Sequence, residues 1–114
     1  IVVEKSKAFA VRIVRLYQYL CSDKKEFVLS KQLLRSGTSI GANVKEAIRG
    51  QSKPDFISKM SVALKEASET EYWLELLYET GFMDKKRFDS IYADNQELLK
   101  ILMRIVKSSK ERRT

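Results

Sequence analysis

Residues 30–50 read SKQLLRSGTSIGANVKEAIRG, and this stretch decides the fold class of the chain. Its apolar side chains recur at helical spacing, at Leu33, Ile40, Val44, Ala47 and Ile48. Gly37 and Gly41 fall inside this periodic segment, although glycine costs about 1 kcal/mol relative to alanine within a helix. Together with Ser36 and Ala42, they would let another backbone approach closely. We therefore predict a helix that packs tightly against a neighbour.

Within this predicted helix, Gly37-Thr38-Ser39-Ile40-Gly41 matches the nucleophile-elbow pattern of serine hydrolases. That pattern needs a strand leading into the turn and a base that accepts the serine proton. The chain contains no histidine, and no β-branched run precedes Gly37. The match is therefore not a catalytic signal, and we predict no catalytic residues and no enzyme activity.

Helix end signals divide the chain into four helices. The first is predicted over residues 4–21. The second begins at Leu29 or Ser30 and ends at Gly50, which suits the left-handed position that closes a helix. The third begins at Ser52-Lys53-Pro54-Asp55, which offers a cap, an early proline and an acid at the positive helix end. It stops at Thr80-Gly81, and the fourth helix follows an Asp84 cap.

Each predicted helix carries one main apolar stripe for the core. The stripe residues are Phe9, Ile13, Leu16, Tyr17 and Leu20; Leu33, Ile40, Val44 and Ala47; Phe56, Met60, Ala63, Leu64, Ala67, Glu71, Leu74, Leu77 and Tyr78; and Phe88, Ile91, Tyr92, Asn95, Leu98, Leu99, Leu102, Ile105 and Val106. Because the loops are short, neighbouring helices should be antiparallel. The predicted fold is all-α, an antiparallel up-down-up-down four-helix bundle that forms one domain over residues 1–114. Its basic tail, residues 107–114, is predicted to fray.

Composition narrows the classes of site. The single cysteine, Cys21, excludes an intramolecular disulfide and a cysteine-built zinc or iron–sulfur site, and we expect it to pack as a small hydrophobe in a reducing compartment. Glu66 and Glu69 have the spacing of a di-iron bundle ligand pair, but no histidine completes that site. No apolar run approaches the ~20 residues that span a bilayer. We predict a cytoplasmic protein without metal, cofactor or membrane contact.

Two helices carry a second line of residues beside their core stripes. On the second helix this line is Arg35, Ser39, Asn43 and Glu46. On the third helix it is Val62, Glu66, Glu69, Trp73 and Leu76. One hypothesis is a subunit interface, since interfaces concentrate aromatic anchors with a charged rim. The alternative is a network inside one bundle, in which Arg35 pairs with Glu66 or Glu69 and Asn43 bonds neighbouring backbone.

The net charge of +7 is unevenly distributed, because residues 1–50 and the tail are basic while residues 51–106 are mildly acidic. Such asymmetry is typical either of a nucleic-acid footprint or of self-association between unlike halves. The candidate phosphate contacts are Lys5, Lys7, Arg12, Arg15, Lys24, Lys25, Lys31, Lys45, Arg49, Lys107, Lys110, Arg112 and Arg113.

A family resemblance rests on four segments, which are QLLRSGTSIGANVKEA at 32–47, DFI at 55–57, ALKEA at 63–67 and ETEYWL at 69–74. In these segments the chain resembles the four-helix bundle proteins related to those encoded by intervening sequences in bacterial 23S ribosomal RNA genes. The resemblance implies a bundle that assembles as a ring-like homopentamer, with no established enzyme activity. It also makes Arg35, Ser39, Asn43 and Glu46 structural or interface candidates.

Two functional hypotheses follow. The first is an oligomeric scaffold or assembly module, whose partner is a protein and whose unlike halves associate. The second is binding of structured RNA or another nucleic acid through backbone phosphates. Protein contacts that assemble a ring could also create the surface that RNA meets, so the two hypotheses are compatible.

Overall fold

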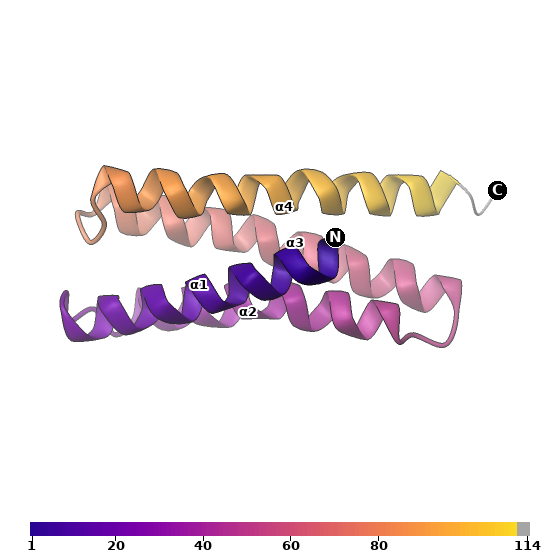
Figure 1. Ribbon diagram of the computed structural model, residues 1–114, viewed down its shortest axis with the longest axis horizontal. Helices are drawn as coiled ribbons and strands as arrows, with labels where there is room; N and C mark the ends of the chain where they lie inside the picture. The colour runs from indigo at the N-terminus through magenta and orange to yellow at the C-terminus, as the bar shows by residue number, and fades with distance from the viewer. Residues whose placement is uncertain (112–114) are drawn as a thin grey trace.

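The computed structural model describes residues 1–111 and contains four helices in that range. They are α1 (Val2–Ser22), α2 (Leu29–Ile48), α3 (Lys53–Glu79) and α4 (Lys85–Glu111). Each helix packs against the next in sequence, and α1 also contacts α4, which closes the ring of four. The molecule is an elongated bundle of 49 × 21 × 20 Å with up-down-up-down topology (Figure 1). The predicted fold class is confirmed.

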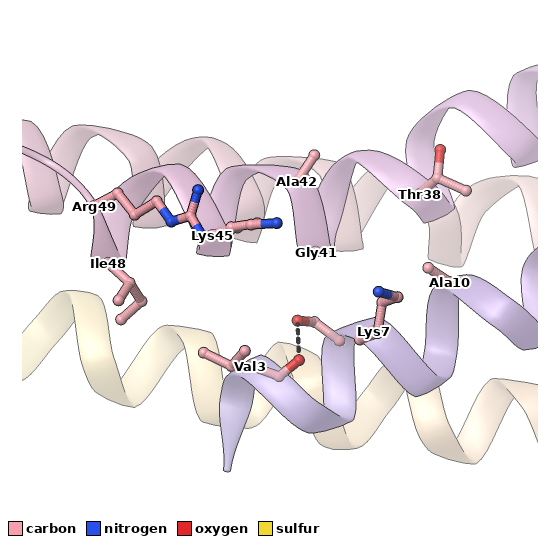
Figure 2. A pocket seen from close by; sticks show the side chains of 10 residues that line it. Val3, Lys7, Ala10, Thr38, Gly41, Ala42, Lys45, Ile48 and Arg49 are labelled. Carbon is pink, nitrogen blue, oxygen red and sulfur yellow. Dashed lines mark hydrogen bonds between the residues drawn. The ribbon is translucent and has the colours of Figure 1, made fainter.

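The core follows the predicted stripes in part, because nine stripe members are half-buried: Tyr17, Phe56, Leu64, Glu71, Tyr78, Phe88, Tyr92, Leu99 and Ile105. Buried side chains include Phe9, Ile13, Leu16 and Leu20 of α1, Leu33, Ile40, Val44 and Ala47 of α2, Met60, Ala63, Ala67, Leu74 and Leu77 of α3, and Ile91, Asn95, Leu98, Leu102 and Val106 of α4. Ile48 lies outside the predicted core stripe of α2, and its side chain is 56% exposed. Figure 2 shows it at the end of α2, pointing toward the gap between α2 and the start of α1.

Two helix starts form as their sequences predict. The Ser52 hydroxyl accepts a hydrogen bond from the Asp55 backbone N–H at 3.2 Å, and α3 begins at the next residue. The Asp84 carboxylate accepts one from the Arg87 backbone N–H at 2.8 Å. That hydrogen bond lowers the pKa of Asp84 from its ordinary value. Both caps satisfy backbone donors that a helix start leaves without partners.

Helix ends differ in part from the predictions. Gly81 follows α3 with φ of 88°, and the Phe82 N–H bonds the Leu77 carbonyl at 2.9 Å, as in a Schellman closure. Gly50 is not left-handed, which corrects the prediction for α2. Instead α2 ends at Ile48, and the Gly50 N–H bonds the Ala47 carbonyl at 3.1 Å. A Cβ at Gly50 would meet Asp55 Oδ2 at 2.6 Å, the end of a side chain that can turn away, and the Ala47 carbonyl oxygen at 3.2 Å.

The termini of the bundle are also longer than predicted. α1 begins at Val2 and continues to Ser22. α4 runs through Glu111, so residues 107–111 are helical where the sequence predicted a frayed tail. Arg112 and Arg113 lie outside the described residues.

Candidate functional site

The two extra residue lines meet along one face, the seam between α2 and α3. Arg35 of α2 bonds both proposed partners on α3: Nη1 donates to Glu66 Oε2 at 2.8 Å, and Nη2 donates to Glu69. Glu46 and Lys59 approach to 3.9 Å nearer the other end of α2. The antiparallel pairing of α2 and α3 therefore brings Arg35 and Glu46 opposite parts of α3 that are about two to three turns apart.

Trp73 extends this cluster. Its indole Nε1 donates to Glu69 Oε2 at 3.0 Å, and Glu69 also accepts from Arg35. The hydrogen bond from Trp73 is the largest effect on the pKa of Glu69; burial opposes it, and Arg35 adds to it, so the pKa is lowered overall. We call Arg35, Glu66, Glu69 and Trp73 the Arg35–Trp73 network. It fixes an indole and a guanidinium in set orientations at the surface.

The remaining polar residues of the α2 line bond their own helix. The Ser39 hydroxyl donates to the Arg35 carbonyl at 2.6 Å, and Asn43 Nδ2 donates to the Ser39 carbonyl at 2.8 Å. These contacts were expected of the alternative in which the line belongs to a network inside one bundle. On the α3 side of this face, two apolar side chains stay accessible to solvent: Val62 is 40% exposed, and Leu76 is half-buried.

Sequence reasoning missed one member of this face. Tyr72 is 57% exposed and packs edge-to-face on Trp73, with ring centroids 5.1 Å apart at 73°. Tyr72 precedes Trp73 in the sequence and therefore falls outside the helical spacing of the line that contains Trp73. Only the contact between the two rings shows that Tyr72 belongs to this face. The aromatic pair joins the Arg35–Trp73 network to the outer surface of α3.

The basic candidates do not form one patch. Arg12 reaches α4, where it bonds Asp94 Oδ2 at 2.6 Å and Ser90 Oγ at 2.9 Å. Lys5 also bonds across α1 and α4, to Glu97 at 3.1 Å. These two cations therefore form partly exposed ion pairs between α1 and α4, so they are not unpaired surface charges.

At the other end of the bundle, Arg15 lines a 310 Å³ hollow with Tyr19 and Arg87. The Arg87 guanidinium lies 4.0 Å from the centre of the Tyr19 ring, a cation–π contact. Lys24, Lys25 and Lys31 are exposed near the connection between α1 and α2.

Lys45 and Arg49 lie at the α1–α2 groove, a 440 Å³ hollow between the start of α1 and the end of α2 (Figure 2). The groove is lined by Val3, Ser6, Lys7, Ala10, Thr38, Gly41, Ala42, Lys45, Ile48 and Arg49. It contains three cations and no carboxylate.

Lys107 and Lys110 belong to a basic stripe on α4 that sequence reasoning did not assemble. With Lys100 and Arg104, and with Leu64, Met103 and Val106, they line a 580 Å³ hollow along α3 and α4. The sequence already contained the evidence for this stripe. Lys100, Arg104, Lys107 and Lys110 are spaced by four, three and three residues, and this spacing places all four cations on one side of a helix.

Glu26 is a second residue whose role the sequence did not reveal. It is buried, and its carboxylate accepts hydrogen bonds from the backbone N–H groups of Val28, Leu29 and Ser30 at 3.2, 3.0 and 2.7 Å. Burial opposes ionisation of this carboxyl, but the backbone hydrogen bonds prevail and lower its pKa. Glu26 thus caps α2 and orders the connection from α1.

Within residues 1–111, no group of three or more Cys, Asp or Glu side chains is arranged to hold a metal ion. Over the same residues, no helix is long and apolar enough to cross a membrane. Cys21 is a half-buried free thiol 3.9 Å from the Ser30 hydroxyl.

Comparison with known proteins gives a consistent assignment. A family model described as 23S rRNA-intervening sequence protein matches residues 1–104. A crystal structure of a protein of unknown function from the S23 ribosomal protein family of Bacteroides thetaiotaomicron VPI-5482 is 56% identical in sequence and superposes with a TM-score of 0.92. The match covers 94% of this chain and 99% of that chain. A search of curated proteins gave no match.

Proposed function

This chain belongs to the 23S rRNA-intervening sequence protein family, and from that premise we propose that it is a non-enzymatic, homo-oligomeric scaffold. One side of the subunit contact is the α2–α3 face, centred on the Arg35–Trp73 network; in a ring it meets a different face of the next copy. Five copies is the number that the family resemblance implies. We place the assembly in the cytoplasm, the reducing compartment that suits its single thiol.

The observation that carries this proposal is the aromatic pair on α3. Tyr72 and the half-buried Trp73 lie in edge-to-face contact at the surface, beside a guanidinium already held by two carboxylates. A preorganised aromatic anchor loses little conformational freedom on association, and Trp, Tyr and Arg are the residues that dominate interface energies. The exposed Val62 extends the same face with apolar surface.

The test is the mass of the protein in solution, measured by light scattering after size-exclusion chromatography. Tyr72→Arg and Val62→Arg place a charge on exposed positions of the proposed interface, so the bundle itself should still fold. We expect both variants to show a smaller mass than the unchanged protein. Phe27→Arg, at an exposed aromatic position in the α1–α2 connection, is the matched control and should keep the original mass. An unchanged mass for Tyr72→Arg and Val62→Arg would refute this interface.

The basic stripe on α4 supports a second function, the binding of structured RNA through phosphates. Among the described residues, no carboxylate lies within ion-pair distance of Lys100, Arg104, Lys107 or Lys110, so their charge remains available. An oligomer would multiply this charge and strengthen the field toward a polyanion.

RNA binding is tested by a salt series with a structured RNA. Each phosphate that a cation neutralises should steepen the log–log dependence of affinity on salt by about 0.7 to 0.9. Lys100→Glu with Lys107→Glu should weaken binding and reduce the slope. Lys24→Glu with Lys86→Glu changes the same charge elsewhere and should have less effect. Equal losses in the two double variants would argue against an α4 site.

A further inference from the structure

The α1–α2 groove is a wedge with one narrow and one open end. At the narrow end, a Cβ on Gly41 would lie 3.3 Å from the Ser6 backbone oxygen, so α1 and α2 are in close contact there. Toward the bundle end the helices separate, and Val3 and Ile48 face the gap from either side (Figure 2). Apart from the cations Lys7, Lys45 and Arg49, the other lining side chains between them are small, so the wedge has apolar walls and room for side chains from outside.

The α1 wall belongs to a second apolar line that the core does not use. Val3, Lys7, Ala10 and Val14 are spaced by four, three and four residues, which keeps them within about 60° on a helix. Val3 and Val14 are 41% and 38% exposed, while Phe9, Ile13, Leu16 and Leu20 of the α1 core stripe are buried. Heptad-like spacing of apolar residues on an exposed flank is the pattern by which one helix packs against another.

The charged residues that line the groove are all cations, although Lys45 and Arg49 also border a neighbouring hollow that contains Glu46 and Asp55. Lys7, Lys45 and Arg49 line the groove, and none of them makes an ion pair within the part of the chain that the structure describes. α1 and α2 contain one carboxylate each, Glu4 and Glu46, and neither lines the groove. An occupant with carboxylates beside its apolar side chains would therefore match both the walls and the rim.

Two other occupants fit less well. The groove has no aromatic lining on which a nucleic-acid base could stack, and its apolar walls gain nothing from phosphates. In a second copy of this chain, most acids of α3 and α4 already have partners; Asp89, Asp94 and Glu97 of α4 pair with Lys85, Arg12 and Lys5. Of the five α3 glutamates, Glu66 and Glu69 are bonded by Arg35, and Glu75 accepts the Tyr92 hydroxyl proton.

We propose that the α1–α2 groove binds an acidic amphipathic helix from a partner protein. Its apolar side chains enter the wedge between Val3 and Ile48, and its carboxylates meet Lys7, Lys45 and Arg49. The groove lies on the α1 side of α2, whereas the Arg35–Trp73 network lies on the α3 side. The groove is therefore distinct from the α2–α3 half of the proposed interface. In a closed ring each copy presents a second face to its neighbour, and the oligomer mass of the groove variants shows whether the groove is that face.

The probe is a fluorescein-labelled three-heptad peptide with Leu at the a and d positions and Glu on the flanking positions. A second peptide has the same composition in permuted order, so it keeps the charge and loses the apolar stripe. A third replaces each Glu with Lys. Binding to the full chain is followed by fluorescence anisotropy, and light scattering records the oligomer mass of every variant.

We expect the acidic amphipathic peptide to bind, and the permuted and lysine peptides to bind at least about tenfold more weakly. Lys45→Glu with Arg49→Glu should weaken the acidic peptide by about tenfold or more, and Ile48→Ser by about fivefold, because Ile48 supplies apolar wall. Lys24→Glu with Lys86→Glu, a matched double reversal elsewhere, should leave affinity within about twofold. The oligomer mass should be the same in all these variants.

Three results would overturn the proposal. Equal binding of the permuted peptide would show a nonspecific charge effect. Full affinity in Ile48→Ser would exclude the wedge as the apolar contact. No binding of the acidic peptide at all would remove the site, and this result is separate from any change in oligomer mass.

Discussion

Gly37 of α2 lies so close to Ile13 of α1 that a Cβ atom at Gly37 would stand 2.8 Å from Ile13 Cγ1 and Cγ2. Both positions are in the buried interior of the bundle. The false nucleophile elbow is thus a helix-packing motif, in which Gly37 accommodates Ile13 and Gly41 accommodates the α1 backbone.

Gly37→Ala should destabilise the bundle despite the better helix propensity of alanine. The propensity gain is about 1 kcal/mol, whereas overpacking a tight core costs about 1 to 3 kcal/mol. Urea unfolding followed by circular dichroism would measure the difference. Ile13→Ala removes both opposing carbons, so Gly37→Ala should be harmless or stabilising in that background. Equal costs of Gly37→Ala in both backgrounds would contradict the contact.

The Arg35–Trp73 network should be visible in the fluorescence of Trp73, which is the only tryptophan. Glu69 has a lowered pKa, so it stays ionised below about pH 4.3, the ordinary value for glutamate. The emission of Trp73 should hold constant down to that pH and change only as the pH falls through the lower, folded-state pKa. Glu69→Gln should abolish this transition, whereas Glu79→Gln, an exposed position on the same helix, should retain it.

Glu26 should make the stability of the bundle depend on pH. Its folded-state pKa is lowered, so its contribution is present above the unfolded value of about 4.3 and is lost as the pH falls through the folded value. Glu26→Ala should cost about 1 to 2 kcal/mol at neutral pH, as for other lost caps. The stability difference between the unchanged protein and Glu26→Gln should shrink on acidification in thermal melts. A difference that stays constant from neutral to acidic pH would exclude the ionised cap.

Asn95 is a buried polar residue whose replacement should not weaken the bundle. Its side chain is 0% exposed, and Nδ2 donates to the Ala67 carbonyl at 3.1 Å. Its Oδ1 has no hydrogen-bond partner within residues 1–111. A buried polar atom without a partner costs about 1 to 3 kcal/mol, so Asn95→Leu should leave the urea midpoint unchanged or raise it. Asn95→Asp, which buries a charge, should lower it at neutral pH and less so in acid.

Much of the fold could be predicted because its signals are local. The Ser52 and Asp84 caps need only a side chain and a backbone N–H three residues later. The Gly50 prediction failed because a turn from Gly50 to Ala47 closed α2 without a left-handed residue. Local chemistry therefore placed the helices well but left one of their closures undecided.

The candidate site was predicted less completely. The spacing of Arg35 and of Glu66 and Glu69 indicated that they could pair, but not that one guanidinium would bond both carboxylates. The stripe containing Lys100 and Arg104 was readable from spacing alone and was overlooked.

By itself, the sequence determined four amphipathic helices, their order, and a core of alternating apolar stripes, because periodicity and capping act within a few residues of the chain. Only the tertiary structure decided that Gly37 faces Ile13, that Glu26 folds back onto the start of α2, and that Ile48 lies beside an open wedge. These outcomes depend on the axial offset between neighbouring helices and on the distance between them. That geometry is set by packing between residues distant in sequence, which no local pattern records.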